Sequence, residues 1–165
     1  MRPIQVLFFA LVLATLGQAI WQHDRLPDRV AAHFNGSGQP DGWMTRGQQT
    51  AWHVVTVLFL TAVFQGIALL QPRLPKEYVN LPHRDYWLAP ERAAVTHAWV
   101  TGVVLRMGCA VLVFFLALFH LLYRANLSPT PRLDGTVWWL TGALLAAVAT
   151  TLIAGVLRFR RPPGT

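Results

Sequence analysis

Four long stretches without a charged side chain constrain this chain more than any other feature of its sequence. They cover residues 4–22, 51–71, 107–123 and 135–157. A helix needs roughly 17–25 mainly apolar residues to cross the hydrocarbon core of a bilayer, and each stretch has that length. Charged residues make up 13% of the chain, whereas soluble domains carry about 25%. The sequence therefore predicts an all-α, polytopic membrane protein whose main partner is the lipid bilayer.

We expect one membrane domain over residues 1–165, with spans at about 4–22, 51–71, 99–123 and 135–157. The first span has two interpretations. The "GQA" at residues 17–19 resembles the end of a cleaved secretory signal, but the apolar run continues through Ile20 and Trp21. A run of that length favours an uncleaved anchor.

The basic residues indicate which side of the membrane each connecting segment faces. Eight of them belong to the two chain ends and the second loop, residues 72–97, and five belong to the first and third loops. Loops rich in Lys and Arg stay in the cytoplasm, so we expect both termini there and the first loop, residues 23–50, outside. The net charge of +7 is spread over segment ends and forms no basic stripe, so we expect no nucleic-acid partner.

The first loop is rich in residues that form turns. The sequence "NGSGQPDG" occupies residues 35–42, and "QPDG" within it predicts a β-turn with Pro40 at the second position. Phe34 and Trp43 flank this segment, and we expect their rings to pack together. The pattern predicts a compact, ordered, hairpin-like cap in which His33 either hydrogen-bonds the turn at residues 35–38 or faces a ligand.

The same loop resembles the signature of a bacterial membrane family, domain of unknown function 1648. The matching positions fix both residue type and spacing, and they are Leu26, Pro27, His33, Phe34, Asn35, Gly38, Pro40, Asp41, Gly42 and Trp43. This family includes SdpI-type proteins, which are longer, give immunity to a secreted peptide toxin and relay its presence across the membrane. The resemblance implies a multi-pass protein of the bacterial cytoplasmic membrane with a role in immunity or signalling.

The second loop predicts a cytoplasmic collar around the helix ends. Its candidate functional residues are Asn80, Pro82, Tyr86, Trp87, Glu91 and Arg92. Pro90 suits the first turn of the next helix, and Glu91 then lies near its positive end. Tyr86 and Trp87 have the character of an interfacial anchor, although a partner site is the alternative.

Arg106 is the charged residue nearest to the middle of a predicted span. If the span begins near residue 98, Arg106 is deep, which costs about 2.5–3.5 kcal/mol at a helix centre, and it lines a polar cavity near Gln65. If the span begins at Met107, the guanidinium reaches back to the cytoplasmic phosphates. Small residues four apart in residues 142–155 indicate close helix packing, either within the chain or in a homodimer.

No motif of a known enzyme mechanism occurs in the chain. The spacing of His23, Asp24, His33 and Asp41 matches no metal site, so we expect no catalytic residue, metal or cofactor. A binding or sensing role remains, with the first loop recognising a peptide or envelope component. The alternative is an accessory subunit that binds another membrane protein.

Overall fold

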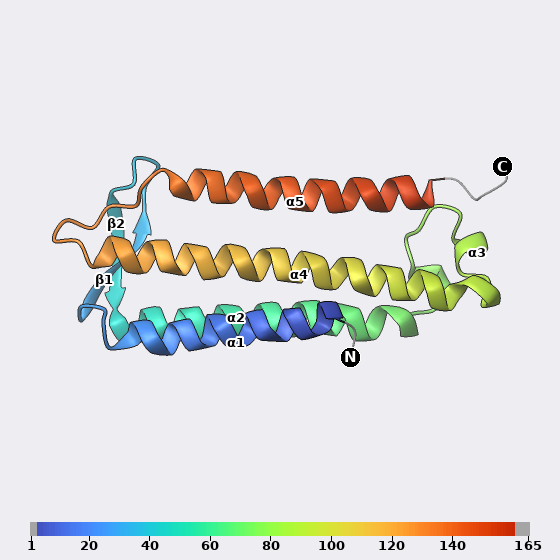
Figure 1. The fold of residues 1–165 in the computed structure, drawn as a ribbon, viewed down its shortest axis with the longest axis horizontal. Coiled ribbons are helices and arrows are strands. Elements are labelled where there is room, and N and C mark those ends of the chain that lie inside the picture. Colours follow the sequence, from blue (N-terminus) through green and yellow to red (C-terminus); the bar gives the residue numbers. More distant parts are fainter. Residues whose placement is uncertain (1–2, 161–165) are drawn as a thin grey trace.

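A computed structural model describes residues 3–160 as four long helices with a small β-hairpin at one end (Figure 1). The elements follow one another as α1 (Pro3–His23), β1 (Arg29–Phe34), β2 (Pro40–Thr45), α2 (Arg46–Leu70), η1 (Gln71–Arg73), η2 (Lys76–Tyr78), α3 (Arg84–Trp87), α4 (Pro90–Asn126) and α5 (Thr136–Phe159). Four of the helices are long and apolar enough to cross a membrane. The predicted all-α, polytopic membrane fold is therefore confirmed.

The two ends of the molecule differ in structure. The hairpin and the loop between α4 and α5 lie at one end, and α3 lies at the other (Figure 1). We refer to these as the hairpin end and the α3 end. The long helices run between them side by side, so every connection within residues 3–160 is made at one of the two ends.

Local signals set where two helices begin. A capping box starts α2, because the Thr45 hydroxyl accepts from the Gln48 backbone N–H while the Gln48 side chain accepts from the Thr45 backbone N–H. This cap places the helix start at Arg46, ahead of the uncharged stretch. Pro90 occupies the first turn of α4, which runs for 37 residues. At 1.5 Å per residue α4 is about 55 Å long, so it extends beyond a hydrocarbon core of about 30 Å.

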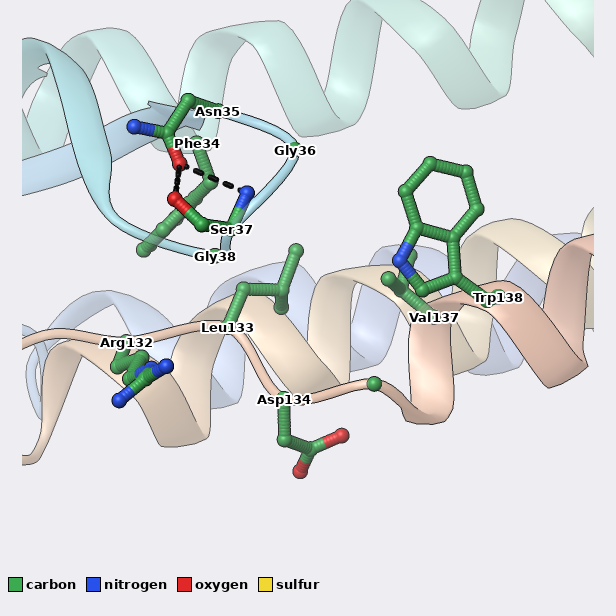
Figure 2. A pocket seen from close by; sticks show the side chains of 11 residues that line it. Phe34, Asn35, Gly36, Ser37, Gly38, Arg132, Leu133, Asp134, Val137 and Trp138 are labelled. Carbon is green, nitrogen blue, oxygen red and sulfur yellow. Dashed lines mark hydrogen bonds between the residues drawn. The ribbon is translucent and has the colours of Figure 1, made fainter.

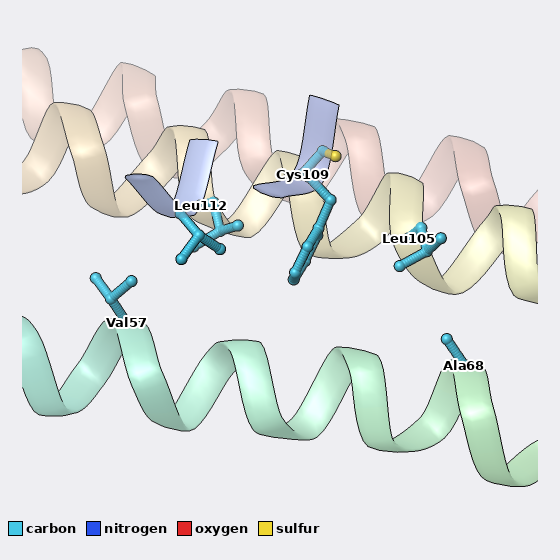
Figure 3. Close-up of a cluster of buried hydrophobic side chains, with 7 residues drawn as sticks. Val57, Ala68, Leu105, Cys109 and Leu112 are labelled. Carbon is cyan, nitrogen blue, oxygen red and sulfur yellow. The ribbon is translucent and has the colours of Figure 1, made fainter. Parts of the chain in front are cut away.

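The apolar core lies where α1, α2 and α4 meet. Its buried members are Phe8, Val12, Val57, Ala68, Leu105, Cys109 and Leu112, five of which are labelled in Figure 3. Gly108 allows the close approach of the helices, since a Cβ atom there would lie 2.6 Å from the Phe8 ring and 2.9 Å from the Phe64 ring. Cys109 is one of the packing residues of this core.

Helix α5 packs along α4 and leaves most of its surface exposed (Figure 1). Gly155 faces the Trp99 ring, with an added Cβ 3.6 Å from it, whereas a Cβ on Gly142 would meet nothing within 4 Å. At the α3 end Phe159 is buried between the rings of Trp87 and Trp99, each in an edge-to-face arrangement. The aromatic contacts therefore fix the last turn of α5 to the α3 end.

Candidate functional site

The signature residues of the first loop fold into the antiparallel hairpin of β1 and β2. Its turn is formed by residues 35–39, and the prediction of a β-turn at "QPDG" is wrong because Pro40, Asp41 and Gly42 belong to β2. The Asn35 carboxamide oxygen accepts hydrogen bonds from the backbone N–H groups of Ser37 and Gln39, each at 3.0 Å. These side-chain hydrogen bonds stabilise a turn at residues 35–39, and the chain forms this turn in place of the one predicted at Pro40.

Gly38 attaches the hairpin turn to the loop between α4 and α5. Its φ of 76° lies in the left-handed region, and a Cβ atom there would lie 2.1 Å from the carbonyl oxygen of Leu133. The Leu133 N–H donates to the Gly38 carbonyl at 2.9 Å. Glycine is required at this position both for its backbone conformation and for this close approach.

A second attachment comes from Asn126, the last residue of α4. Its side chain accepts from the Ala31 N–H at 2.6 Å and donates to the Ala31 carbonyl at 2.9 Å. The carboxamide thereby pairs with the outer edge of β1 as a neighbouring strand would. Below this clamp Leu26 and Val30 are buried against Tyr123. The hairpin is therefore a rigid platform on the helix ends.

Arg46 holds the base of the hairpin. Its guanidinium contacts the Asp28 carboxylate at 3.0 Å and donates to the Leu26 carbonyl at 3.2 Å. The next residue after Leu26 is Pro27, which precedes β1 and stands where the chain leaves α1. The first residue of the signature, Leu26, is thus joined directly to the first residue of α2.

The outward face of the hairpin carries charged and aromatic side chains. The Arg29 guanidinium lies 5.2 Å from the centre of the Trp43 ring, and His33 hydrogen-bonds Asp41 across the strands. The expected packing of Phe34 on Trp43 is wrong, because Trp43 pairs with Arg29 instead. The His33 side chain is 75% exposed and bonds Asp41, so the alternative in which it hydrogen-bonds the turn is wrong, whereas the alternative in which it faces a ligand stays a prediction. Gly42 opposite His33 leaves room for this arrangement.

A groove separates the hairpin turn from the loop between α4 and α5 (Figure 2). It has a volume of about 520 Å³ and is lined by Phe34, Asn35, Gly36, Ser37, Gly38, Arg132, Leu133, Asp134, Gly135, Val137 and Trp138. Its wall includes aromatic rings, a basic and an acidic side chain, and the polar backbone of the turn. Hydrogen bonds from the Thr136 hydroxyl and backbone N–H lower the pKa of Asp134.

Sequence reasoning missed the half of this groove that comes from the third loop, and it missed Asn126. The signal was present, since "SPTPRLDG" at residues 128–135 is as rich in turn residues as the first loop. The sequence does not show, however, that the first and third loops pair, because they are about a hundred residues apart. The hydrogen bond between Leu133 and Gly38 establishes that pairing.

Four of the six residues singled out in the second loop contact one another or α5. The Trp87 indole N–H donates to the Phe159 carbonyl at 3.3 Å, and the Arg92 guanidinium covers the Tyr86 ring at 4.1 Å. Glu91 contacts Arg92 at 3.0 Å. Asn80 and Pro82 lie exposed in the segment before α3. The aromatic pair therefore forms a structural joint of the α3 end.

Arg106 is exposed on the surface of α4. Its guanidinium lies over Gly102, where an added Cβ would be 3.3 Å from it, so the side chain leans one turn toward the α3 end. The alternative in which Arg106 is buried and lines a polar cavity is wrong. Helical side chains tilt toward the N-terminus, and this direction brings the charge closer to the end of the helix.

Within residues 3–160, no group of three or more His, Cys, Asp or Glu residues is arranged to hold a metal ion. The fold and the platform define a multi-pass membrane protein with an ordered hairpin on one end of its helix bundle. Residues 10–60 match the model of the family described as Domain of unknown function (DUF1648), and this segment contains α1 from residue 10 onward, the hairpin and the first part of α2. This segment is thus similar to that family, which confirms the resemblance seen in the signature. No curated protein and no solved structure matches the chain.

Proposed function

We propose that this protein is a non-enzymatic receptor of the bacterial cytoplasmic membrane that binds a peptide at the groove beside the hairpin turn. Both termini are in the cytoplasm and the hairpin faces outward, as the distribution of Lys and Arg favours. The role is that of an immunity or signalling protein of the SdpI type. The groove of about 520 Å³ is the observation that carries the proposal, because small-ligand sites are concave and typically about 300–1,000 Å³ in size.

The chemistry of the groove suits a peptide. Phe34 and Trp138 provide apolar rings, and the turn provides backbone hydrogen-bonding groups. Arg132 and Asp134 add charges of both signs to the lining, with the Asp134 carboxylate directed away from the turn (Figure 2). Such a mixture matches the alternating apolar and polar surface of an extended chain. The turn is held in place by its contact with Leu133, and a rigid site of this kind increases affinity because it loses little conformational entropy on binding.

The hairpin also has a free strand edge to which an extended peptide can add as a third strand. Ala31 and Trp43 are opposite one another in the register, and the Ala31 backbone groups point away from β2 toward Asn126. In an antiparallel pair, when the backbone N–H and C=O of one residue point away from the partner strand, those of the opposite residue do so as well. The Trp43 N–H and C=O therefore lie on the outer edge of β2. A peptide strand can pair with these groups, as in other cases of strand addition.

Helix α4 provides a direct connection from the platform to the cytoplasm. Asn126 at its last turn holds β1, and Thr96 near its first turns donates to the Trp87 carbonyl at 2.8 Å. A shift of the hairpin on ligand binding displaces α4 as a rod, and the joint around Trp87 responds. Signalling in this proposal is a movement of one helix that both ends contact.

Survival under challenge with secreted peptide toxins tests the function. Cells with the wild-type protein, a deletion, Trp138→Ala and Trp43→Ala are exposed to a panel of such peptides. The matched control is Trp139→Ala, because Trp139 is 84% exposed and does not line the groove. We expect protection by the wild type and by the control, and its loss in the two site variants. Equal survival of the deletion strain with every peptide contradicts the immunity role.

The second candidate is an accessory subunit of a membrane complex that binds its partner through α5. The open surface at Gly142 favours it, because small residues let a second helix approach closely. A photo-crosslinking residue at 142 is expected to capture one partner in constant ratio, while one at 155, which faces Trp99, does not. A product that is only the homodimer, or no product at all, contradicts this role.

A further inference from the structure

A small polar cavity lies directly beneath the hairpin, between α1, α2 and α4. Its volume is about 10 Å³, and its lining includes Gln22, Thr50, His53, Phe119 and Asn126. Two of these side chains are almost completely buried, since Gln22 is 4% exposed and His53 is 3% exposed. The cavity is close to the size of one water molecule.

Both buried side chains carry a nitrogen without a hydrogen-bond partner. These atoms are Nε2 of Gln22 and Nε2 of His53. An unpaired buried polar group costs about 1–3 kcal/mol, and the cost is greater in the lipid-embedded part of a chain because no bulk water can reach it. Two such groups lining one cavity therefore call for a bound polar species.

The two unpaired nitrogens determine what that species must offer. The Gln22 nitrogen is a donor, whereas Nε2 of a neutral imidazole is a donor or an acceptor according to the tautomer. The bound species must therefore accept from Gln22 and be able to pair with His53 in either sense.

We propose that one water molecule occupies this cavity and bridges Gln22 and His53. It accepts from the Gln22 amide and pairs with Nε2 of the His53 imidazole, because water can donate to a lone pair and also accept from an N–H group. A cation does not fit, because both nearest unpartnered atoms are nitrogens and one of them is a donor. This inference stands independently of the proposed peptide receptor.

The water site joins the hairpin platform to the helix bundle. Asn126 lines the cavity and also clamps β1, and Leu26, which lines it as well, packs against Val30 of β1. On α2, the His53 ring stacks on Phe119 of α4 with 3.6 Å between ring centres. The bridge thereby links α1 and α2 at the level where the hairpin rests on α4.

Hydroxyl-radical footprinting by pulsed X-rays tests for this water, because an ordered internal water yields radicals that oxidise the side chains next to it. The purified full-length protein in nanodiscs is the sample. We expect Phe119 to be oxidised several times faster than Phe8, which is fully buried in the apolar core. Oxidation of Phe119 at the rate of Phe8 in the wild type overturns the proposal.

A pair of substitutions distinguishes the bound water from leakage of bulk solvent. Gln22→Leu with His53→Phe removes both groups that hold the water and keeps an aromatic ring against Phe119. We expect the oxidation of Phe119 to fall to the rate of Phe8 in this double variant, and unchanged oxidation contradicts a water held by these two residues. If the double variant does not fold, His53→Phe alone is expected to reduce the oxidation of Phe119, and no reduction contradicts the bridge.

Discussion

Replacement of Gly38 by alanine is expected to detach the hairpin turn from the loop between α4 and α5. Two costs add at this position. The backbone φ of 76° is unfavourable by about 1 kcal/mol or more for a residue with a Cβ atom. That Cβ would also lie 2.1 Å from the Leu133 carbonyl oxygen, so the Leu133 N–H bond to Gly38 breaks, at about 0.5–1.5 kcal/mol.

The sum is at least about 1.5–2.5 kcal/mol against the docked arrangement, which corresponds to a shift of about 12- to 60-fold in the docking equilibrium. The matched control is Gly36→Ala, since a Cβ on Gly36 meets nothing within 4 Å and its φ is not positive. We expect the control to dock as the wild type does.

Hydrogen exchange of the Leu133 amide measures docking, because this N–H donates to the Gly38 carbonyl in the docked arrangement. The exchange rate is expected to rise strongly with Gly38→Ala and to be unchanged with Gly36→Ala. Equal rates in the two glycine variants refute the argument that the close approach to Leu133 requires glycine.

Three further predictions concern the platform and its orientation. Asn126→Leu leaves the N–H and C=O of Ala31 buried without partners, at about 1–3 kcal/mol for each, so hydrogen exchange of the Ala31 amide is expected to accelerate. Hydrogen bonds from the first turn of α5 lower the pKa of Asp134, so the carboxylate stabilises the fold above the ordinary carboxyl pKa, and this stabilisation is lost as the pH falls through the lowered value. The melting temperature of an Asp134→Asn variant is therefore expected to fall less at acid pH than that of the wild type. An equal fall in the two proteins contradicts this prediction. In a Cys109→Ala background that removes the natural thiol, a thiol at Ser37 is expected to react with an impermeant reagent on intact cells while a thiol between α2 and α3 does not, and the reverse pattern inverts the proposed topology.

The helix spans were accessible from the sequence because lipid imposes a local requirement. Every backbone polar group in the hydrocarbon must be paired within its own helix, and each residue there must be mainly apolar, so length and composition suffice. The beginning of α4 was also indicated locally, through Pro90. The earlier beginning of α2 depends on the capping box of Thr45 and Gln48, which lies outside the uncharged stretch.

The hairpin shows where local signals become ambiguous. The sequence between residues 35 and 42 contains two possible turns, and each has suitable residues. The turn at Asn35 prevails because Gly38 then meets Leu133, a contact with a residue almost a hundred positions away. In the same way Trp43 takes Arg29 and His33 takes Asp41, since the register of the two strands decides which side chains are neighbours.

By itself the sequence determined that this chain crosses a membrane as helices and carries a hairpin of a known family signature between the first two. These properties depend on the length of apolar runs and on the turn residues of one short segment. Only the tertiary structure decided that Asn126 clamps β1, that two distant loops enclose a groove, that Arg106 lies on the surface, and that His53 and Gln22 share a buried cavity. Each of these depends on the rotation and register of packed helices, which bring together residues whose separation along the chain carries no information about their distance in space.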